Sequence, residues 1–334
     1  MTGGNSGTPG PVPLLGIMAD PHIGQSQAEG LVRTCIAWLL DRGVSAILVA
    51  GDLNERPGEP GFGVWARDPQ GGGLPPEVQI VPCVGNWDTE VPPGVYDQTP
   101  IWPHATMQTR HDMLFQGREY FRWSVGGLSV FSLNNLTPYL TGAGVDAYAN
   151  CNPPGSRTVL NPDHSGITVP SSAERVWLDE QADLTRDMPW KAGLMHRPPW
   201  SNYDTDPRRM HRDCREPLTH AIDCGLSLVV SGDQHVGCLS GPWYPPEVLV
   251  EPGGVGAYCL VLMGGYQCRP IDNALLPEGS ILWSRGSSPV DPVCHAATLA
   301  LGEDIAWLAI FEASNADPQG RVVWAQNIAR NPGV

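Results

Sequence analysis

Residues 14–22 read LLGIMADPH, in which the apolar run Leu14–Ala19 is followed at once by Asp20, Pro21 and His22. A short run of this kind predicts a buried β-strand. Alternate residues of an extended segment point the same way, so Asp20 and His22 can face one point beyond the strand. A surface aspartate beside an incidental histidine gives the same pattern, so its meaning depends on the residues at the ends of the other strands.

The same arrangement recurs along the chain. Further short apolar runs predict buried strands at residues 46–50, 79–84, 128–133, 192–195 and 226–231. Four of these runs lead directly into polar residues, which are Gly51-Asp52, Gly85-Asn86-Trp87-Asp88, His196, and Gly232-Asp233-Gln234-His235. Ligands of an open α/β sheet collect at the carboxyl edge of its strands, so we expect these side chains to gather in one site.

Helical patterns separate the predicted strands. Residues 27–42 carry Leu31, Cys35 and Leu39 on one face, and similar helices are predicted at 174–187 and 215–224. Alternating strands and helices favour an α/β fold of layered sheets covered by helices. A closing pair of strands is predicted at 305–311 and 321–325, and long Gly/Pro-rich loops, expected to be binding walls or lids, at 54–77, 134–170 and 264–295.

Composition excludes several classes of protein. The 334 residues include 39 Gly and 34 Pro, with only 16% charged residues, which excludes a coiled coil. The 41% hydrophobic content and 12 Trp exclude a disordered chain, and no apolar run approaches the roughly 18 residues of a membrane span. A net charge of −15 makes nucleic acid an unlikely partner, although a local basic groove could override it.

Cysteine usage indicates the compartment. The nine Cys are scattered and form no C-x-x-C pair, and the first residues show no export signal. We therefore expect reduced thiols and a cytoplasmic protein without a membrane partner. The sequence does not predict the oligomeric state.

The ordered set of strand-end motifs resembles the calcineurin-like metallophosphoesterase superfamily. Its pattern of D-x-H, G-D, G-N-H-[DE], a lone H and G-H-x-H corresponds in order to residues 20–235. The resemblance implies a four-layer α/β/β/α sandwich in a single domain over 1–334, with a metal-binding core at about 14–240 and C-terminal loop and strands at about 241–330. It also implies two divalent metal ions and a hydroxide bridging them that attacks phosphorus.

The ligands carry over residue by residue. The resemblance assigns Asp20, His22, Asp52 and His235 to one metal, and Asp52 as a bridge, Asn86, His196 and Asp233 to the other. Imidazole, carboxylate and one amide oxygen together suit Mn, Fe, Zn or a similar ion. A bridging carboxylate is needed to hold two cations about 3.5 to 4 Å apart. Decayed or purely structural ligands are the alternative.

The sequence departs from the family at two positions. Asp233 stands where the family has a histidine, as in G-D-x-H forms of PhoD-type phosphodiesterases, and a carboxylate can still bind metal. Trp87 replaces the histidine credited with protonating the leaving group, a step worth about 10²- to 10⁴-fold. Trp87 could form a stacking wall for a substrate ring or simply pack.

Three histidines are candidates to take over the missing role, namely His104, His111 and His211. A good leaving group or a metal-bound water would make a replacement unnecessary. Asp88 could accept an N–H from His104 or His111, or be solvated. Arg197, directly after His196, could bind a phosphate oxygen with two hydrogen bonds or pair with a surface carboxylate.

These features predict a hydrolase acting on a phosphoric ester of a small molecule. A diester or an anhydride is favoured, because without the family's histidine a poor leaving group would lack its proton donor. The alternatives are a phosphomonoesterase or a nuclease of the same fold, and a non-catalytic protein that binds phosphorylated ligands.

Overall fold

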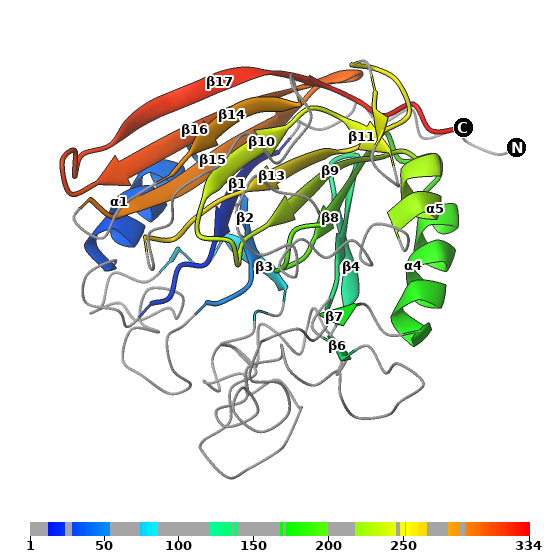
Figure 1. The fold of residues 1–334 in the computed structure, drawn as a ribbon, viewed down its shortest axis with the longest axis horizontal. Helices are drawn as coiled ribbons and strands as arrows, with labels where there is room; N and C mark the ends of the chain where they lie inside the picture. The colour runs from blue at the N-terminus through cyan, green and yellow to red at the C-terminus, as the bar shows by residue number, and fades with distance from the viewer. Residues whose placement is uncertain are drawn as a thin grey trace, which may run out of the picture.

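The computed structural model describes residues 13–23, 29–53, 74–75, 77–83, 85, 120–134, 137–138, 168–169, 172–199, 218–244, 248–250, 252–265, 280–286 and 291–334. These residues form two mixed β-sheets that stack face to face, with helices on their outer sides (Figure 1). Two ribbons of two short strands each, β6 (Thr137–Pro138) with β7 (Thr168–Val169) and β11 (Trp243–Tyr244) with β12 (Val248–Leu249), complete the described strands.

The first sheet has six strands in the order β17-β16-β15-β1-β2-β3. Three of them are parallel neighbours that carry the predicted strand ends, β1 (Leu14–Ala19), β2 (Ala46–Ala50) and β3 (Gln79–Cys83). The other three are long antiparallel strands from the C-terminal part, β15 (Val293–Leu301), β16 (Ile305–Ser314) and β17 (Arg321–Ala329). The carboxyl ends of β1, β2 and β3 therefore meet at one edge of this sheet.

The second sheet has seven strands in the order β14-β10-β13-β9-β8-β5-β4. Its parallel centre consists of β13 (Tyr258–Val261), β9 (Leu226–Ser231), β8 (Trp190–Leu194) and β5 (Leu128–Ser132). Antiparallel strands flank this centre, with β14 (Ile281–Arg285) and β10 (Gly237–Ser240) on one side and β4 (Phe121–Val125) on the other. The predicted ligands from β8 and β9 thus follow neighbouring parallel strands.

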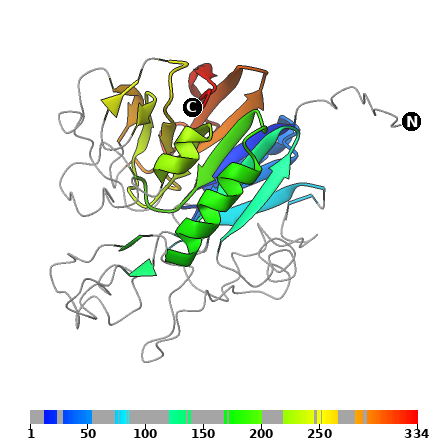
Figure 2. The ribbon, with the colours of Figure 1, turned by 90° about the vertical axis from the view of Figure 1, so that its right-hand side faces the viewer.

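Three buried apolar clusters hold the layers together. The central cluster joins the facing sheets through side chains such as Ile17 and Leu48 on one side and Val130 and Val230 on the other. Helix α1 (Glu29–Asp41) packs on the outer face of the first sheet, while α4 (Ser172–Leu184) and α5 (Thr219–Asp223) cover the second (Figure 2). The layers are therefore α/β/β/α, as the sequence predicted.

The predicted loop at 264–295 is partly wrong. It contains β14 and the first residues of β15, which the sequence analysis did not predict as strands. Each strand has a partner distant in sequence, because β14 pairs with β10 and β15 pairs with β1. The other partner of β15 is the next strand, β16. Among the described residues, no helix has both the length and the apolar character needed to cross a membrane.

Candidate metal centre

The two sheets bring six of the seven predicted metal ligands to one place. Asp20 and His22 follow β1, Asp52 follows β2, His196 follows β8, and Asp233 and His235 follow β9. The turns after β1 and β2 are joined by backbone hydrogen bonds, in which His22 N–H donates to the Asp52 carbonyl at 3.0 Å and Ile23 N–H to that of Leu53 at 3.2 Å. Between the strands of the second sheet, Gly232 N–H donates to the His196 carbonyl at 2.8 Å. The ligands therefore stand on backbone that is fixed by hydrogen bonds.

The backbone at the predicted ligands is strained. Among the described residues, the non-glycine residues with positive φ are Asp20, His22, Asp52, Asp233 and His235, at 39° to 59°. Each has been predicted from sequence as a metal ligand. A left-handed conformation costs an L-residue roughly 1–2 kcal/mol, and such strain clusters at functional sites. The fold therefore holds these five side chains in orientations that an ordinary turn would not give them.

Asp52 occupies the centre of the cluster. Its Oδ2 lies 3.4 Å from His22 Nε2 and 3.3 Å from His196 Nε2, so it faces one ligand assigned to each metal. On the other sides of the site, His196 Nε2 lies 3.6 Å from Asp233 Oδ1, and the rings of His22 and His235 stack with centroids 5.6 Å apart. This is the position that a bridging carboxylate requires.

The orientation of His196 suits a metal ligand. Its Nδ1 lies 3.0 Å from the Ala50 carbonyl, which can only accept a hydrogen bond, so we assign the proton to Nδ1. Nε2 is then the nitrogen directed at Asp52 and Asp233, and it would offer its lone pair to a metal ion once an ion displaces its proton. Metal-binding histidines typically donate their second ring N–H to a backbone carbonyl in this way.

The carboxylates of the cluster lie in an environment that disfavours negative charge. Asp20 is fully buried, and neither of its carboxylate oxygens accepts a hydrogen bond. Burial raises the pKa of Asp20 to about 8, with a further contribution from Asp52, although His196 and His22 act in the opposite direction. Burial alone lowers the pKa of His196, but Asp52, Asp20 and Asp233 outweigh it and raise the pKa to about 10. A bound cation would therefore stabilise the ionised form of Asp20, which burial alone disfavours.

The donor set fits divalent metal ions. Asp20, Asp52 and His196 each offer an atom within 4.8 Å of the others. Carboxylates with neutral imidazoles are ligands of Mn, Fe or Zn, and the two unsatisfied oxygens of Asp20 are the groups that such an ion would satisfy. The residues present therefore fit the metal centre that the sequence predicts.

Glycines leave no free space behind the ligand loops. A Cβ on Gly232 would lie 2.3 Å from Asp20 Oδ1, and one on Gly85 would lie 2.2 Å from Asp52 Oδ1. Gly264 lies in the segment that follows β13, and a Cβ on it would lie 1.6 Å from the Asp20 carbonyl oxygen. Gly264 contributes to the site by close backbone approach, and the sequence analysis did not single it out.

Arg197 lies in the site rather than on the surface. Its side chain is buried, and its Nε lies 3.7 Å from Asp233 Oδ1. Pairing of Arg197 with a surface carboxylate was the alternative that its sequence position left open. The structure pairs Arg197 with a predicted ligand instead.

Five predicted catalytic or substrate-binding residues and one predicted metal ligand lie outside the described residues. These are Trp87, Asp88, His104, His111 and His211, together with the ligand Asn86. Their roles stay predictions. Gly85, which precedes them, is described and packs against Asp52.

Comparisons with known proteins agree with this fold. No protein-family model matches the chain, and no curated protein matches it in sequence. Among solved structures, it is similar to a purple acid phosphatase from yellow lupin (Lupinus luteus), with 13% identity and a TM-score of 0.63 over 96% of this chain. The chain spans only 54% of the length of that phosphatase.

Two further solved structures have the same fold. A dimetal phosphatase from Danio rerio is 14% identical with a TM-score of 0.53, the match covering 96% of this chain and 99% of that protein. GAP50, the anchor in the inner membrane complex of Plasmodium, is 9% identical with a TM-score of 0.54, covering 96% of this chain and 90% of that protein. The chain has the calcineurin-like metallophosphoesterase fold, which confirms the fold expected from the strand-end motifs. Since phosphatases and an anchor share it, function has to be argued from the site.

Proposed function

We propose that the chain is a metal-dependent hydrolase of phosphoric esters with two divalent cations in the strand-end site. The observation that carries the proposal is the strained, converging ligand set, because Asp52 and four further predicted ligands hold left-handed backbone. A protein that had lost its metal chemistry would have no need to maintain this strain. The dimetal phosphatase of the same fold supports the proposal.

Bound cations would supply charge neutralisation for the phosphoryl oxygens and an activated water nucleophile. The residues of the chain determine where this happens. Asp52 is placed between the two groups of ligands, and the hydrogen bond from His196 Nδ1 to the Ala50 carbonyl keeps Nε2 directed into the site. Asp233 and Arg197 form the side contributed by the second sheet, where the Arg197 guanidinium would bind a phosphate oxygen.

The substrate class follows from the departures in sequence. Trp87 takes the place of a proton donor, so we propose a phosphodiester or phosphoanhydride of a small molecule, whose leaving group depends less on protonation. Trp87, His104 and His111 are proposed to contact the substrate, with Asp88 and His211 assisting proton transfer. The net charge of −15 supports a small substrate over nucleic acid.

Manganese is the proposed working metal and the cytoplasm the proposed location. The mixed donor set supports an ion of the Mn, Fe or Zn type. None of the six described cysteines forms a disulfide, which supports a reducing compartment.

The test is release of nitrophenol from an aryl phosphodiester and from the matching monoester in the presence of Mn²⁺. Both substrates have good leaving groups, so they test the metal site without the missing histidine. We expect turnover that Asp52→Ala abolishes and that Asp41→Asn, a change at the exposed end of α1, leaves unaltered. Metal binding without turnover of either ester would contradict the hydrolase and favour a protein that only binds phosphorylated ligands.

A further inference from the structure

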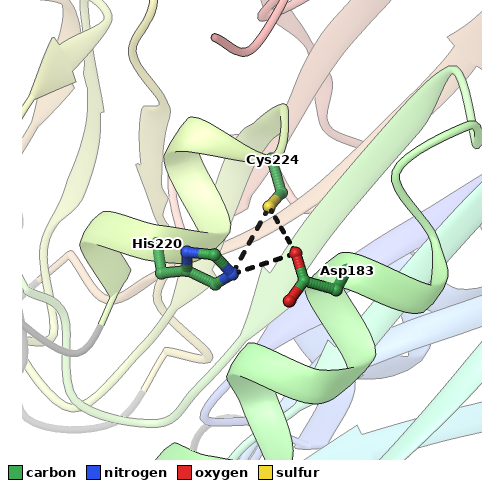
Figure 3. Close-up of side chains that lie close together, drawn as sticks. All are labelled: Asp183, His220 and Cys224. Atoms are coloured by element: carbon green, nitrogen blue, oxygen red, sulfur yellow. Dashed lines mark hydrogen bonds and ion pairs between the residues drawn. The ribbon is translucent and has the colours of Figure 1, made fainter.

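A second group of side chains of the kinds that bind metals lies between helices α4 and α5. Asp183 belongs to α4, His220 belongs to α5, and Cys224 directly follows α5 (Figure 3). His220 Nε2 lies 3.2 Å from Asp183 Oδ1 and 3.6 Å from Cys224 Sγ, and Sγ lies 3.7 Å from the same carboxylate oxygen. Three atoms of different chemistry therefore converge on one point.

The local sequence places these side chains on facing helix surfaces. His220 and Cys224 are four residues apart, and Cys224 N–H donates to the His220 carbonyl at 2.9 Å, so the helical turn between them is intact. Residues with this spacing lie on one face of a helix. On α4, Asp179 lies one turn before Asp183, and its carboxylate interacts electrostatically with His220. The pairs D-x₃-D and H-x₃-C thus oppose each other.

The arrangement differs from a nucleophilic cysteine triad. In such a triad the imidazole uses one nitrogen for the thiol and the other for the carboxylate. Here His220 Nε2 contacts both Cys224 and Asp183. One nitrogen cannot relay a proton between two partners in this way, whereas it can share a ligand sphere with them.

The distances match a tetrahedral zinc site. Zinc binds thiolate sulfur at about 2.3 Å, imidazole nitrogen at about 2.0–2.1 Å and carboxylate oxygen at about 2.0–2.2 Å. At tetrahedral angles these bond lengths separate sulfur from nitrogen by about 3.6 Å, nitrogen from oxygen by about 3.4 Å, and sulfur from oxygen by about 3.6 Å. The observed 3.6, 3.2 and 3.7 Å agree within about 0.2 Å, the tolerance expected of a metal site.

The cluster is accessible to an ion. Cys224 is buried at its base, while the side chains of His220 and Asp183 are 40% and 58% exposed. Thiolate, imidazole and carboxylate together are ligands for zinc and similar borderline ions. Asp179 or a water could take the fourth position.

We propose that Asp183, His220 and Cys224 form a zinc-type site that clamps α4 to α5, separate from the strand-end metal centre. The site goes beyond the proposed hydrolase and does not depend on it. It would hold together the two helices that cover the second sheet. Strands β8 and β9 of this sheet lead to His196 and Asp233.

Arg186 would compete with the ion for two of the three proposed ligands. Its Nη2 lies 3.2 Å from both Cys224 Sγ and Asp183 Oδ1. Because the Arg186 side chain is 51% exposed, it can turn away into solvent when an ion binds. Removing it should therefore strengthen metal binding.

Cobalt(II) titration of the full chain tests the proposal. A thiolate ligand gives cobalt a sulfur-to-metal charge-transfer band, and tetrahedral coordination gives intense d–d bands. None of the described ligands of the strand-end centre is a cysteine, so the charge-transfer band is assigned to the helical site, and its loss in Cys224→Ser checks that assignment. We expect one thiolate-bound cobalt per chain, displaced by Zn²⁺.

Variants decide the assignment. Cys224→Ser should lose the band, Asp183→Asn should weaken cobalt binding at least tenfold, and Arg186→Ala should tighten it several-fold. Glu180→Gln removes an exposed carboxylate of α4 outside the cluster and should change nothing. Circular dichroism checks the fold of each variant, and the exposed Asp183→Asn decides the question if Cys224→Ser does not fold. Absence of the band in the reduced wild-type protein, or its persistence in Cys224→Ser, would overturn the proposal.

Discussion

Replacing Gly264 by Ala should disable the strand-end centre without touching a ligand side chain. A Cβ at this position would lie 1.6 Å from the carbonyl oxygen of Asp20, 2.3 Å from its carbonyl carbon and 2.8 Å from Pro21 Cα. All three are backbone atoms, so no side chain can turn aside. Ordinary carbon contacts need about 3.5 Å, so the two backbone segments have to separate by roughly 2 Å.

That displacement exceeds what the metal centre tolerates. Ligand distances in metal sites hold to about 0.2 Å, and a misplacement of about 1 Å can reduce turnover about 10²-fold. We expect Gly264→Ala to lower kcat/KM for an aryl phosphodiester at least about 100-fold and to weaken Mn²⁺ binding. Overpacking should lower the free energy of unfolding by about 1–3 kcal/mol, measured by urea denaturation.

Two glycine variants serve as matched controls. In Gly193→Ala the new Cβ would meet side chains of Val229 and Leu226 at 3.7–4.0 Å, which is ordinary contact, although Gly193 lies on the strand that leads to His196. In Gly30→Ala nothing lies within 4 Å, and the exposed helical position should gain up to about 1 kcal/mol. Full activity and unchanged metal affinity in Gly264→Ala would refute the argument that close backbone packing positions Asp20.

Three further results are expected. Adding Mn²⁺ should raise the melting temperature, because binding at a hundredfold excess over Kd stabilises the folded protein by about 2.7 kcal/mol per site. Asp20→Asn should lose most of this shift. Equal shifts in both proteins would place the metal elsewhere. Burial raises the pKa of Glu312, but His295 and Arg285 outweigh burial and lower this pKa from 4.5 to about 2. The ionised Glu312 therefore stabilises the folded protein fully above about pH 4.5, and this contribution is lost as the pH falls towards 2. Glu312→Gln should therefore lower the free energy of unfolding by about 2 kcal/mol at pH 7, after allowance for solvent screening at the partly exposed Arg285. In urea denaturation, this difference from the wild type should shrink between pH 5 and pH 2.5. A difference that does not change with pH would contradict this. Trp87→His should raise turnover of alkyl phosphodiesters, which have poor leaving groups, by up to about 10²-fold and leave nitrophenyl esters nearly unchanged; equal effects on both would remove the leaving-group argument.

The parallel strands were predictable because each is a contiguous apolar run with a polar end. β1, β2 and β9 begin and end at the predicted residues. β15 was not predicted, since its sequence VCHAATLAL contains few branched residues and resembles a helix as much as a strand. It is a strand because β16 pairs with it on one side and β1 on the other, and the pairing with β1 is a constraint that local sequence does not carry.

The six described candidate ligands could be named from the sequence, but their conformation could not. The order of strand-end motifs indicated Asp20, Asp52 and His196, whereas the left-handed backbone at Asp20 and Asp52 has no glycine to signal it. The helical cluster was missed for another reason. Its three side chains come from α4 and from the end of α5, which are distant in sequence, and the available signal was the spacing of His220 and Cys224 within the last predicted helix.

If Asp52 holds two metal ions in one centre, as we propose, electron paramagnetic resonance of the Mn²⁺-loaded protein should detect the two ions as a pair. Two Mn²⁺ ions sharing a carboxylate about 3.5 to 4 Å apart are exchange-coupled and give the spectrum of a spin-coupled pair. We expect this spectrum for the wild type and isolated, uncoupled Mn²⁺ in Asp52→Asn. A wild-type spectrum of uncoupled ions at full metal loading would contradict it.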